Sequence, residues 1–172
     1  GSFAVDQMLP YIVAQLLGAA LGATLVWLVY KDHFDATVDA DTKLGVFCTG
    51  PAIPNKGLNF LSEAVGTFAL MFVVFYITDG ELTYGSNSTI PIGLGSVGAI
   101  PVSFTVWVIG LALGGTTGYA INPARDFAPR LVHTLLPIKG KGSSHWDYAW
   151  IPVVGPLVGA ALAGLLYDLL HG

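Results

Sequence analysis

Long apolar stretches alternate with shorter polar ones along this chain of 172 residues. Four stretches contain enough apolar residues to cross a bilayer, at about 8–30, about 58–78, within 90–114 and at about 148–170. A helix of about 20 apolar residues spans the hydrocarbon core of a membrane. We therefore predict four transmembrane helices.

The polar stretches between the predicted helices contain residues that favour turns and solvent. Four Asp and three Lys residues lie in segment 31–57, together with Pro51, Pro54 and Gly57. Segment 79–89 is rich in Gly, Ser and Asn, which are typical of turns. Both segments are predicted to be solvated connections outside the membrane.

A fifth segment differs from the predicted spans, because a glycine-rich run leads into a short helical stretch. The run 114–122 reads Gly-Gly-Thr-Thr-Gly-Tyr-Ala-Ile-Asn, and its glycines predict an extended conformation rather than a helix. The helical stretch that follows, 123 to about 136, is too short to span a bilayer. Irregular backbone at membrane depth requires protein or a water-filled cavity around its polar groups. We predict that this re-entrant half-helix lines a pore.

Composition supports lipid as the solvent and excludes several classes of protein. Hydrophobic residues make up 53% of the chain and charged residues only 10%, whereas soluble domains carry about 25% charged residues. The formal net charge of −4 offers no basic surface for nucleic acid, and the single Cys48 excludes an intramolecular disulfide. We find no nucleophile–base pair, phosphate loop or nucleotide motif, so we predict neither an enzyme nor a bound cofactor.

The four histidines, His33, His133, His145 and His171, show no spacing typical of a metal site. No metal is therefore predicted. Each histidine is predicted to be a solvated or interfacial residue.

Two segments of the chain are similar to each other. Residues 12–21 resemble residues 153–162, and both contain the run Gly-Ala-Ala-Leu. Membrane channels and transporters are often built from inverted repeats, although Gly, Ala and Leu are also common in unrelated membrane helices. We interpret 1–172 as a single transmembrane domain, in which a second repeat covers about 58–172 and the start of the first repeat is missing.

The segment Asn122-Pro123-Ala124-Arg125-Asp126 begins the half-helix. Asn is a favoured N-cap and Pro fits the first helical position, so in a soluble protein this segment would indicate only a helix start. At membrane depth, the positive end of the helix dipole faces the lumen and repels cations. The Asn122 amide can then donate to a passing hydroxyl or water. This pattern predicts a pore for neutral solutes.

Residues 118–130 resemble the second signature loop of the aquaporin superfamily, in its glycerol-facilitator branch. Asp126, Arg130, Pro152 and Val153 match the same branch. The resemblance covers the third to the sixth family helix. It implies an all-α membrane protein with four transmembrane helices and one re-entrant half-helix, the carboxy-terminal part of a six-plus-two inverted-repeat fold. The first two helices and the first half-helix of the family have no counterpart here.

The resemblance also assigns roles to individual residues. Arg125 matches the arginine of the narrowest constriction, Tyr119 its aromatic wall, and Gly110 the small residue opposite, where water-selective relatives have His. An extended run would leave free carbonyl oxygens to replace the hydration of the solute. This predicted ladder is formed by Gly118, Tyr119, Ala120 and Ile121.

Other residues are predicted to support the pore or the packing of helices. The resemblance implies that Glu63 accepts hydrogen bonds from pore-loop amides, and Asp126 is counted as a further support. Gln15 is predicted to form a polar bond between helices. Close helix packing is predicted at three pairs of small residues: Gly18 and Gly22, Gly110 and Gly114, Gly155 and Gly159.

The function implied by the resemblance is passive diffusion of glycerol and water, with other small neutral solutes, through a homotetramer in the plasma membrane. A water-selective aquaporin is one alternative, for which His at position 110 would be expected. A non-conducting membrane scaffold of the same fold is another. A coupled transporter would require intramembrane acids beyond Glu63.

Overall fold

A computed structural model describes residues 4–78, 80–85 and 88–172 of the chain. The elements in chain order are η1 (Val5–Gln7), α1 (Met8–Val29), α2 (Lys31–Ala36), α3 (Ala40–Gly45), α4 (Lys56–Phe75), β1 (Gly80–Tyr84), β2 (Ser88–Ile92), η2 (Gly95–Ala99), α5 (Ile100–Thr117), α6 (Pro123–Leu135) and α7 (Ile151–His171).

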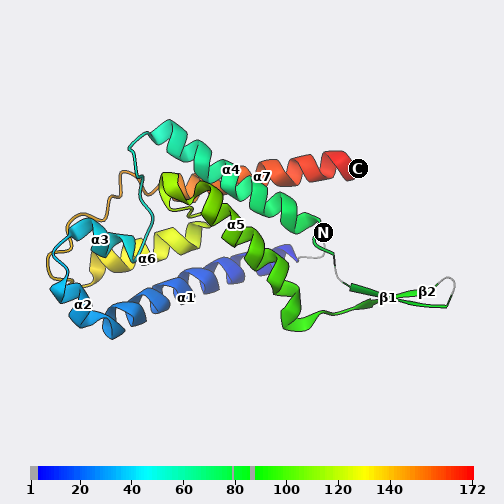
Figure 1. Cartoon of the computed structure of the whole chain (residues 1–172), viewed down its shortest axis with the longest axis horizontal. Coiled ribbons are helices and arrows are strands. Elements are labelled where there is room, and N and C mark those ends of the chain that lie inside the picture. Colours follow the sequence, from blue (N-terminus) through cyan, green and yellow to red (C-terminus); the bar gives the residue numbers. More distant parts are fainter. Residues whose placement is uncertain (1–3, 79, 86–87) are drawn as a thin grey trace.

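Within the described part of the chain, four helices are long and apolar enough to cross a membrane, which confirms the predicted spans. They cover Val5–Val29, Lys56–Phe75, Val97–Thr117 and Ile151–His171. Helix α6 has 13 residues and is too short to span. Figure 1 shows α6 lying beside α1. The structure therefore combines four membrane-length helices with one half-length helix.

Helix α5 starts inside the predicted range of 90–114 but ends beyond it. It starts after β2 and η2, and it continues to Thr117, so the glycines at 114 and 115 are helical. The predicted extended run therefore begins only at Gly118, which has φ +80 and donates its N–H to the Gly114 carbonyl. Glycine is tolerated in a membrane helix, because the surroundings offer its backbone groups no competing partners.

The connection predicted at 79–89 forms part of an antiparallel hairpin rather than an irregular loop. Leu82 pairs with Ile90 across the two strands, and Gly85 has φ +71 at the turn. Figure 1 shows the hairpin extending beyond the ends of the helices, on the side where the C-terminus lies. Residues 79, 86 and 87 of the predicted connection lie outside the described part of the chain.

The connection predicted at 31–57 is not wholly solvated, because α2 and α3 fold over the end of α6. Phe34, Phe47 and Cys48 are buried against Val132 of α6. Lys43, predicted to be solvated, is 3% exposed and donates to the Lys139 carbonyl. A buried ammonium group requires such a partner. The segment therefore covers the C-terminal part of the half-helix.

Close packing of α4 against α7 depends on glycine. A Cβ atom at Gly159 would lie 2.1 Å from the Ala64 carbonyl oxygen, and one at Gly155 would lie 2.9 Å from Cβ of Glu63. This pair of glycines therefore packs two helices, as its spacing predicts. By contrast, a Cβ atom at Gly18 or Gly22 would meet nothing within 4 Å.

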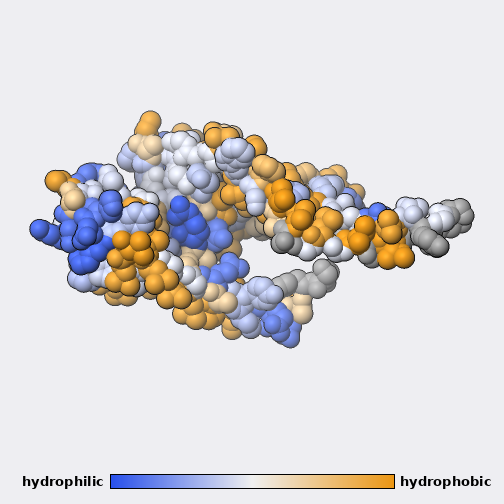
Figure 2. Space-filling view, turned by 60° about the horizontal axis from the view of Figure 1, so that its bottom comes forward, coloured by the Kyte–Doolittle hydropathy of each residue, from blue (hydrophilic) through white to orange (hydrophobic). Residues whose placement is uncertain are grey.

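Most large apolar side chains of the long helices are exposed. Figure 2 shows hydrophobic surface along the helices, with hydrophilic surface over the left end and in smaller patches near the centre and at the lower tip. None of the residues of α1 is buried, although the helix contains 22 residues. Such a surface suits contact with lipid or with other membrane helices.

Candidate pore site

The N-terminus of α6 carries the predicted Asn-Pro-Ala segment. Asn122 has extended backbone, and its Oδ1 atom accepts hydrogen bonds from the N–H groups of Ala124 at 2.9 Å and Arg125 at 3.3 Å. Pro123 occupies the first helical position, where no N–H is required. Because Oδ1 caps the helix, the exposed Asn122 amide retains its two donors for another ligand.

Glu63 of α4 holds the loop before α6. Its carboxylate is 1% exposed and accepts from the N–H groups of Ala120 at 3.0 Å and Ile121 at 2.8 Å. The Thr117 hydroxyl donates to the same carboxylate at 2.6 Å. This is the arrangement that the family resemblance implies for Glu63. Removing the Glu63 carboxylate would leave the buried N–H groups of Ala120 and Ile121 without an acceptor, and an unsatisfied buried group costs about 1–3 kcal/mol.

The loop held by Glu63 is not a regular extended strand. Tyr119 and Ile121 both have φ +41, and they alternate with Gly118 and Ala120. A non-glycine residue with positive φ is strained and requires support from its surroundings. The hydrogen bonds to the Glu63 carboxylate supply that support. Among the described residues, no hydrogen bond outside the helices and strands has a carbonyl oxygen of 118–121 as its acceptor.

The predicted constriction residues come from three elements. Tyr119 of the loop lies against Gly110 of α5, where an added Cβ atom would be 2.9 Å from Cζ of the ring. Arg125 is exposed in the first turn of α6. It lines a cavity of about 480 Å³ with Gly22 of α1 and Phe47. The structure thus brings Tyr119 and Gly110 into contact and places Arg125 on an open face.

A buried ion pair anchors the middle of α6. Asp126 and Arg130 are both fully buried, and the guanidinium donates from Nε to Oδ1 at 2.8 Å and from Nη2 to Oδ2 at 3.0 Å. The backbone N–H and hydroxyl of Thr49 each donate to Asp126 Oδ2 at 2.7 Å. Arg130 also donates to the carbonyls of Thr49, Ser144 and His145.

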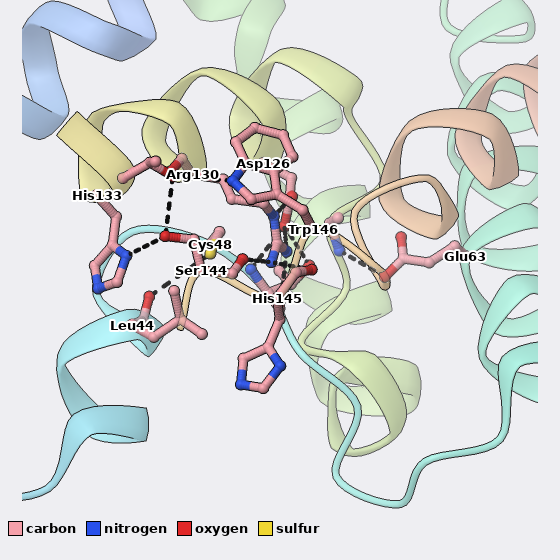
Figure 3. A network of polar contacts seen from close by, with 12 residues as sticks. Leu44, Cys48, Glu63, Asp126, Arg130, His133, Ser144, His145 and Trp146 are labelled. Carbon is pink, nitrogen blue, oxygen red and sulfur yellow. Dashed lines mark hydrogen bonds and ion pairs between the residues drawn. The ribbon is translucent and has the colours of Figure 1, made fainter. Parts of the chain in front are cut away.

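Figure 3 shows this network between the labelled residues Asp126, Arg130, Ser144 and His145. It joins α6 to the segment before α4 and to the segment before α7, so the half-helix is fixed from two sides. The sequence offers one signal for the ion pair, the i,i+4 spacing of Asp126 and Arg130. It offers none for Thr49, which lies 77 residues away from Asp126.

His133 corrects the prediction of a solvated histidine. The side chain is 0% exposed, its Nδ1 atom lies 2.8 Å from the Ser144 hydroxyl, and its ring lies edge-on to Phe47. Two segments cover the ring: Phe47 follows α3, and Ser144 lies before α7. The remaining histidines, His33, His145 and His171, are exposed.

The C-terminus of α6 has a cap that the sequence does not predict. The Lys141 ammonium donates to the carbonyls of His133 at 2.8 Å, Thr134 at 2.6 Å and Leu136 at 2.7 Å. A cation at this end complements the helix dipole and satisfies carbonyls that lack an intrahelical partner. The half-helix therefore has an amide at its positive end and an ammonium at its negative end.

Gln15 of α1 is the predicted support that finds no partner. Its side chain is exposed, and no described residue forms a hydrogen bond with it. The predicted polar bond between helices is therefore absent within the described part of the chain.

Among the residues that the structure describes, four membrane-length helices and a half-helix with a capped polar N-terminus define a multi-pass membrane protein of the re-entrant-helix class. The family profile of the major intrinsic proteins matches residues 1–167. The chain belongs to the major intrinsic protein family, which confirms the resemblance to the aquaporin superfamily.

Similar proteins carry names that refer to glycerol. The chain is 47% identical to glycerol uptake facilitator protein 3 of Lactiplantibacillus plantarum over 99% of its own length and 66% of that protein. It is 48% identical to a probable glycerol uptake facilitator protein of Thermotoga maritima, over 99% and 68% of the two chains. For the glycerol uptake facilitator protein of Bacillus subtilis, identity is 47% over 98% and 57%.

The fold also resembles that of a solved structure. The X-ray structure of the aquaglyceroporin from Plasmodium falciparum superimposes with a TM-score of 0.76 at 25% identity, covering 96% of this chain and 65% of that one. The chain thus spans about two thirds or less of the length of most of these proteins.

Proposed function

We propose that the chain forms part of a passive membrane channel for glycerol and water, with other small neutral solutes. Asn122 and Arg125 supply donors on the polar side of the candidate pore, and the Tyr119 ring supplies an apolar side. A polyol has hydroxyl groups on one edge and carbon atoms on the other. Glycerol therefore matches both sides at once, which agrees with the names of the relatives.

Selection against ions follows from charge. The positive end of the α6 dipole and the Arg125 guanidinium both lie at the N-terminus of the half-helix. A cation or proton approaching this point is repelled, whereas a neutral solute is not. Carbonyl oxygens of 118–121 are proposed to accept hydrogen bonds from the solute and replace its hydration.

The contact between Tyr119 and Gly110 is the observation that favours a channel for glycerol and water over a water-selective channel. A Cβ atom at Gly110 would come within 3.2 Å of the tyrosine hydroxyl and within 2.9 Å of the ring. A residue with a side chain at this position would therefore displace the ring. The glycine leaves room for an aromatic wall that the carbon edge of a polyol can contact.

The channel is proposed to lie in the plasma membrane as a homotetramer with one pore per subunit. The exposed apolar surface of the helices is available both for lipid and for neighbouring subunits. Chemical cross-linking of the purified protein in detergent tests the tetramer, and four linked subunits are expected.

Stopped-flow light scattering of proteoliposomes tests the function. Vesicles containing the full protein should shrink quickly in sucrose, and in glycerol they should shrink and then re-swell quickly. Fast shrinkage without fast re-swelling would identify a water-selective channel. Rates equal to those of empty liposomes would contradict conduction and favour a scaffold.

A further inference from the structure

Two glycines of α5 face the same aromatic ring. Gly110 and Gly114 are one helical turn apart, so they lie on one face of the helix. For both, the three heavy atoms nearest to an added Cβ atom belong to Tyr119. An added Cβ at Gly110 would lie 2.9 Å from Cζ, and one at Gly114 would lie 2.9 Å from Cδ1. The ring therefore lies lengthwise along α5.

This contact differs from the helix packing predicted for the pair. Gly159 of α7 is closest to backbone atoms of α4, whereas Gly114 is closest to a side chain of the pore loop. A Cβ atom at the neighbouring Gly115 would meet nothing within 4 Å. Within this part of α5, the absence of a side chain is therefore required at Gly110 and Gly114 and not at Gly115.

The backbone of Tyr119 has little freedom to adjust to a larger residue. Before it, the Gly118 N–H donates to the Gly114 carbonyl at 2.9 Å. After it, the Ala120 N–H is held by Glu63 at 3.0 Å. Tyr119 itself has φ +41, a conformation that few side chains tolerate. A ring displaced from α5 must turn about its side-chain bonds toward its open side, where 40% of the residue is exposed.

We propose that Gly114 is a specificity-determining residue, which acts with Gly110 by holding the Tyr119 ring flat against α5 and so sets the width of the pore. This inference rests on the proposed channel function, in which the open side of the ring is the lumen. A side chain at position 114 would push the ring into the lumen. The larger solute would be affected more strongly than water.

The Gly114→Ala variant tests this proposal in proteoliposomes, with Gly115→Ala as the matched control. Glycerol permeability of Gly114→Ala is expected to fall about tenfold, equivalent to a barrier higher by about 1.4 kcal/mol. Water permeability should fall much less, and Gly115→Ala should resemble the unaltered protein. Equal effects of the two variants would overturn the proposal.

A double variant separates the ring contact from a general defect. Combining Gly114→Ala with Tyr119→Ala removes the ring, so the glycine substitution should then have no further effect beyond that of Tyr119→Ala. If Gly114→Ala fails to assemble, the double variant should assemble. Failure of both would overturn the proposal, because the clash would lie elsewhere.

The experiments distinguish an error in the proposed function from an error in the proposed role of Gly114. If the unaltered protein conducts water and no glycerol, the function is wrong, and the same variants still test the ring through water permeability. A decrease for Gly114→Ala that disappears without the ring would support the role of Gly114. A decrease that persists without the ring would contradict it.

Discussion

Glu63 shows how one side chain holds a strained loop. A single carboxylate accepts from two consecutive backbone N–H groups and one hydroxyl, next to two non-glycine residues with positive φ. Neither the helix that carries Glu63 nor the loop provides these contacts alone. The stability that these hydrogen bonds provide therefore depends on the Glu63 side chain.

Glu63→Gln is expected to lower the thermal stability of the protein in detergent. The side-chain NH2 of Gln cannot accept a hydrogen bond as the second Glu63 oxygen does, so one loop N–H loses its acceptor, at a cost of about 1–3 kcal/mol. The midpoint of thermal unfolding, followed by size-exclusion chromatography of heated samples, measures the effect. Glu81→Gln on the exposed strand β1 is the control and should change little. Equal midpoints would contradict the role of Glu63.

Cys48 lies outside the spans, and its reactivity reports on the packing of α3 over α6. Burial raises the pKa of its thiol to about 12, from an ordinary value of 9.0. The thiolate is the reactive form, so alkylation by iodoacetamide at pH 8 should be slow in the folded protein. Its rate should keep increasing above pH 9 instead of levelling off. Mass spectrometry measures modification of this single cysteine, and SDS-unfolded protein should react rapidly. If the alkylation rate of the folded protein reached half of its maximum near pH 9, this result would contradict burial of the thiol.

At the scale of elements, α6 is a half-helix fixed at both ends and in the middle. Asn122 caps its N-terminus, Lys141 caps its C-terminus, and the pair of Asp126 and Arg130 joins it to two other segments. Its N-terminus carries the donors of the candidate pore. The position of these donors therefore depends on contacts made further along the helix.

Arg130→Met is expected to destabilise the protein strongly. It leaves the Asp126 carboxylate buried without its countercharge, and breaking a buried pair in this way costs about 3–5 kcal/mol. The double variant Asp126→Leu with Arg130→Met removes both charges, so it should cost less than the sum of its single variants. Thermal midpoints in detergent provide the comparison.

The exposed pair of Lys31 and Asp35 is a matched control for that experiment. It has the same i,i+4 spacing and an Nζ–Oδ2 distance of 3.0 Å, but its side chains are 52% and 43% exposed. Lys31→Met should therefore cost only about 0.3–0.5 kcal/mol. If Arg130→Met lost as little stability as Lys31→Met, burial of the ion pair would not make the protein more dependent on it.

At the scale of the whole molecule, the contact between α4 and α7 joins two membrane-length helices that lie far apart in the sequence. Gly159 allows the backbones of these helices to approach, because a Cβ atom there would meet the Ala64 carbonyl at 2.1 Å. A carbonyl of a neighbouring helix cannot rotate away as a flexible side chain can. The arrangement of the helices thus depends on this glycine.

Gly159→Ala is expected to separate α4 from α7 and to destabilise the protein by about 1–3 kcal/mol or more, as overpacking does. Gly164→Ala on the same helix is the control, since an added Cβ atom there meets nothing within 4 Å. The yield of monodisperse protein in detergent and its thermal midpoint measure both variants. Equal behaviour would contradict close packing at Gly159.

Local sequence pattern determined the features that depend on residues close together in the chain. The four spans follow from hydropathy and length, and the start of α6 follows from Asn122 and Pro123. The packing of Gly155 and Gly159 follows from their spacing. These features need no distant partner to be recognised, because helix caps and apolar length act within a few turns.

Tertiary structure alone decided the features that join distant segments. Thr49 reaches Asp126 across 77 residues, His133 becomes buried beside Phe47 and Ser144, and Gly114 contacts a ring instead of a helix. The sequence predicted a solvated Lys43 and a solvated or interfacial His133, because a polar residue type records what a side chain prefers and not which neighbours fold over it. Hydrogen-bond partners and close contacts exist only once the chain has packed, so composition and spacing cannot specify them.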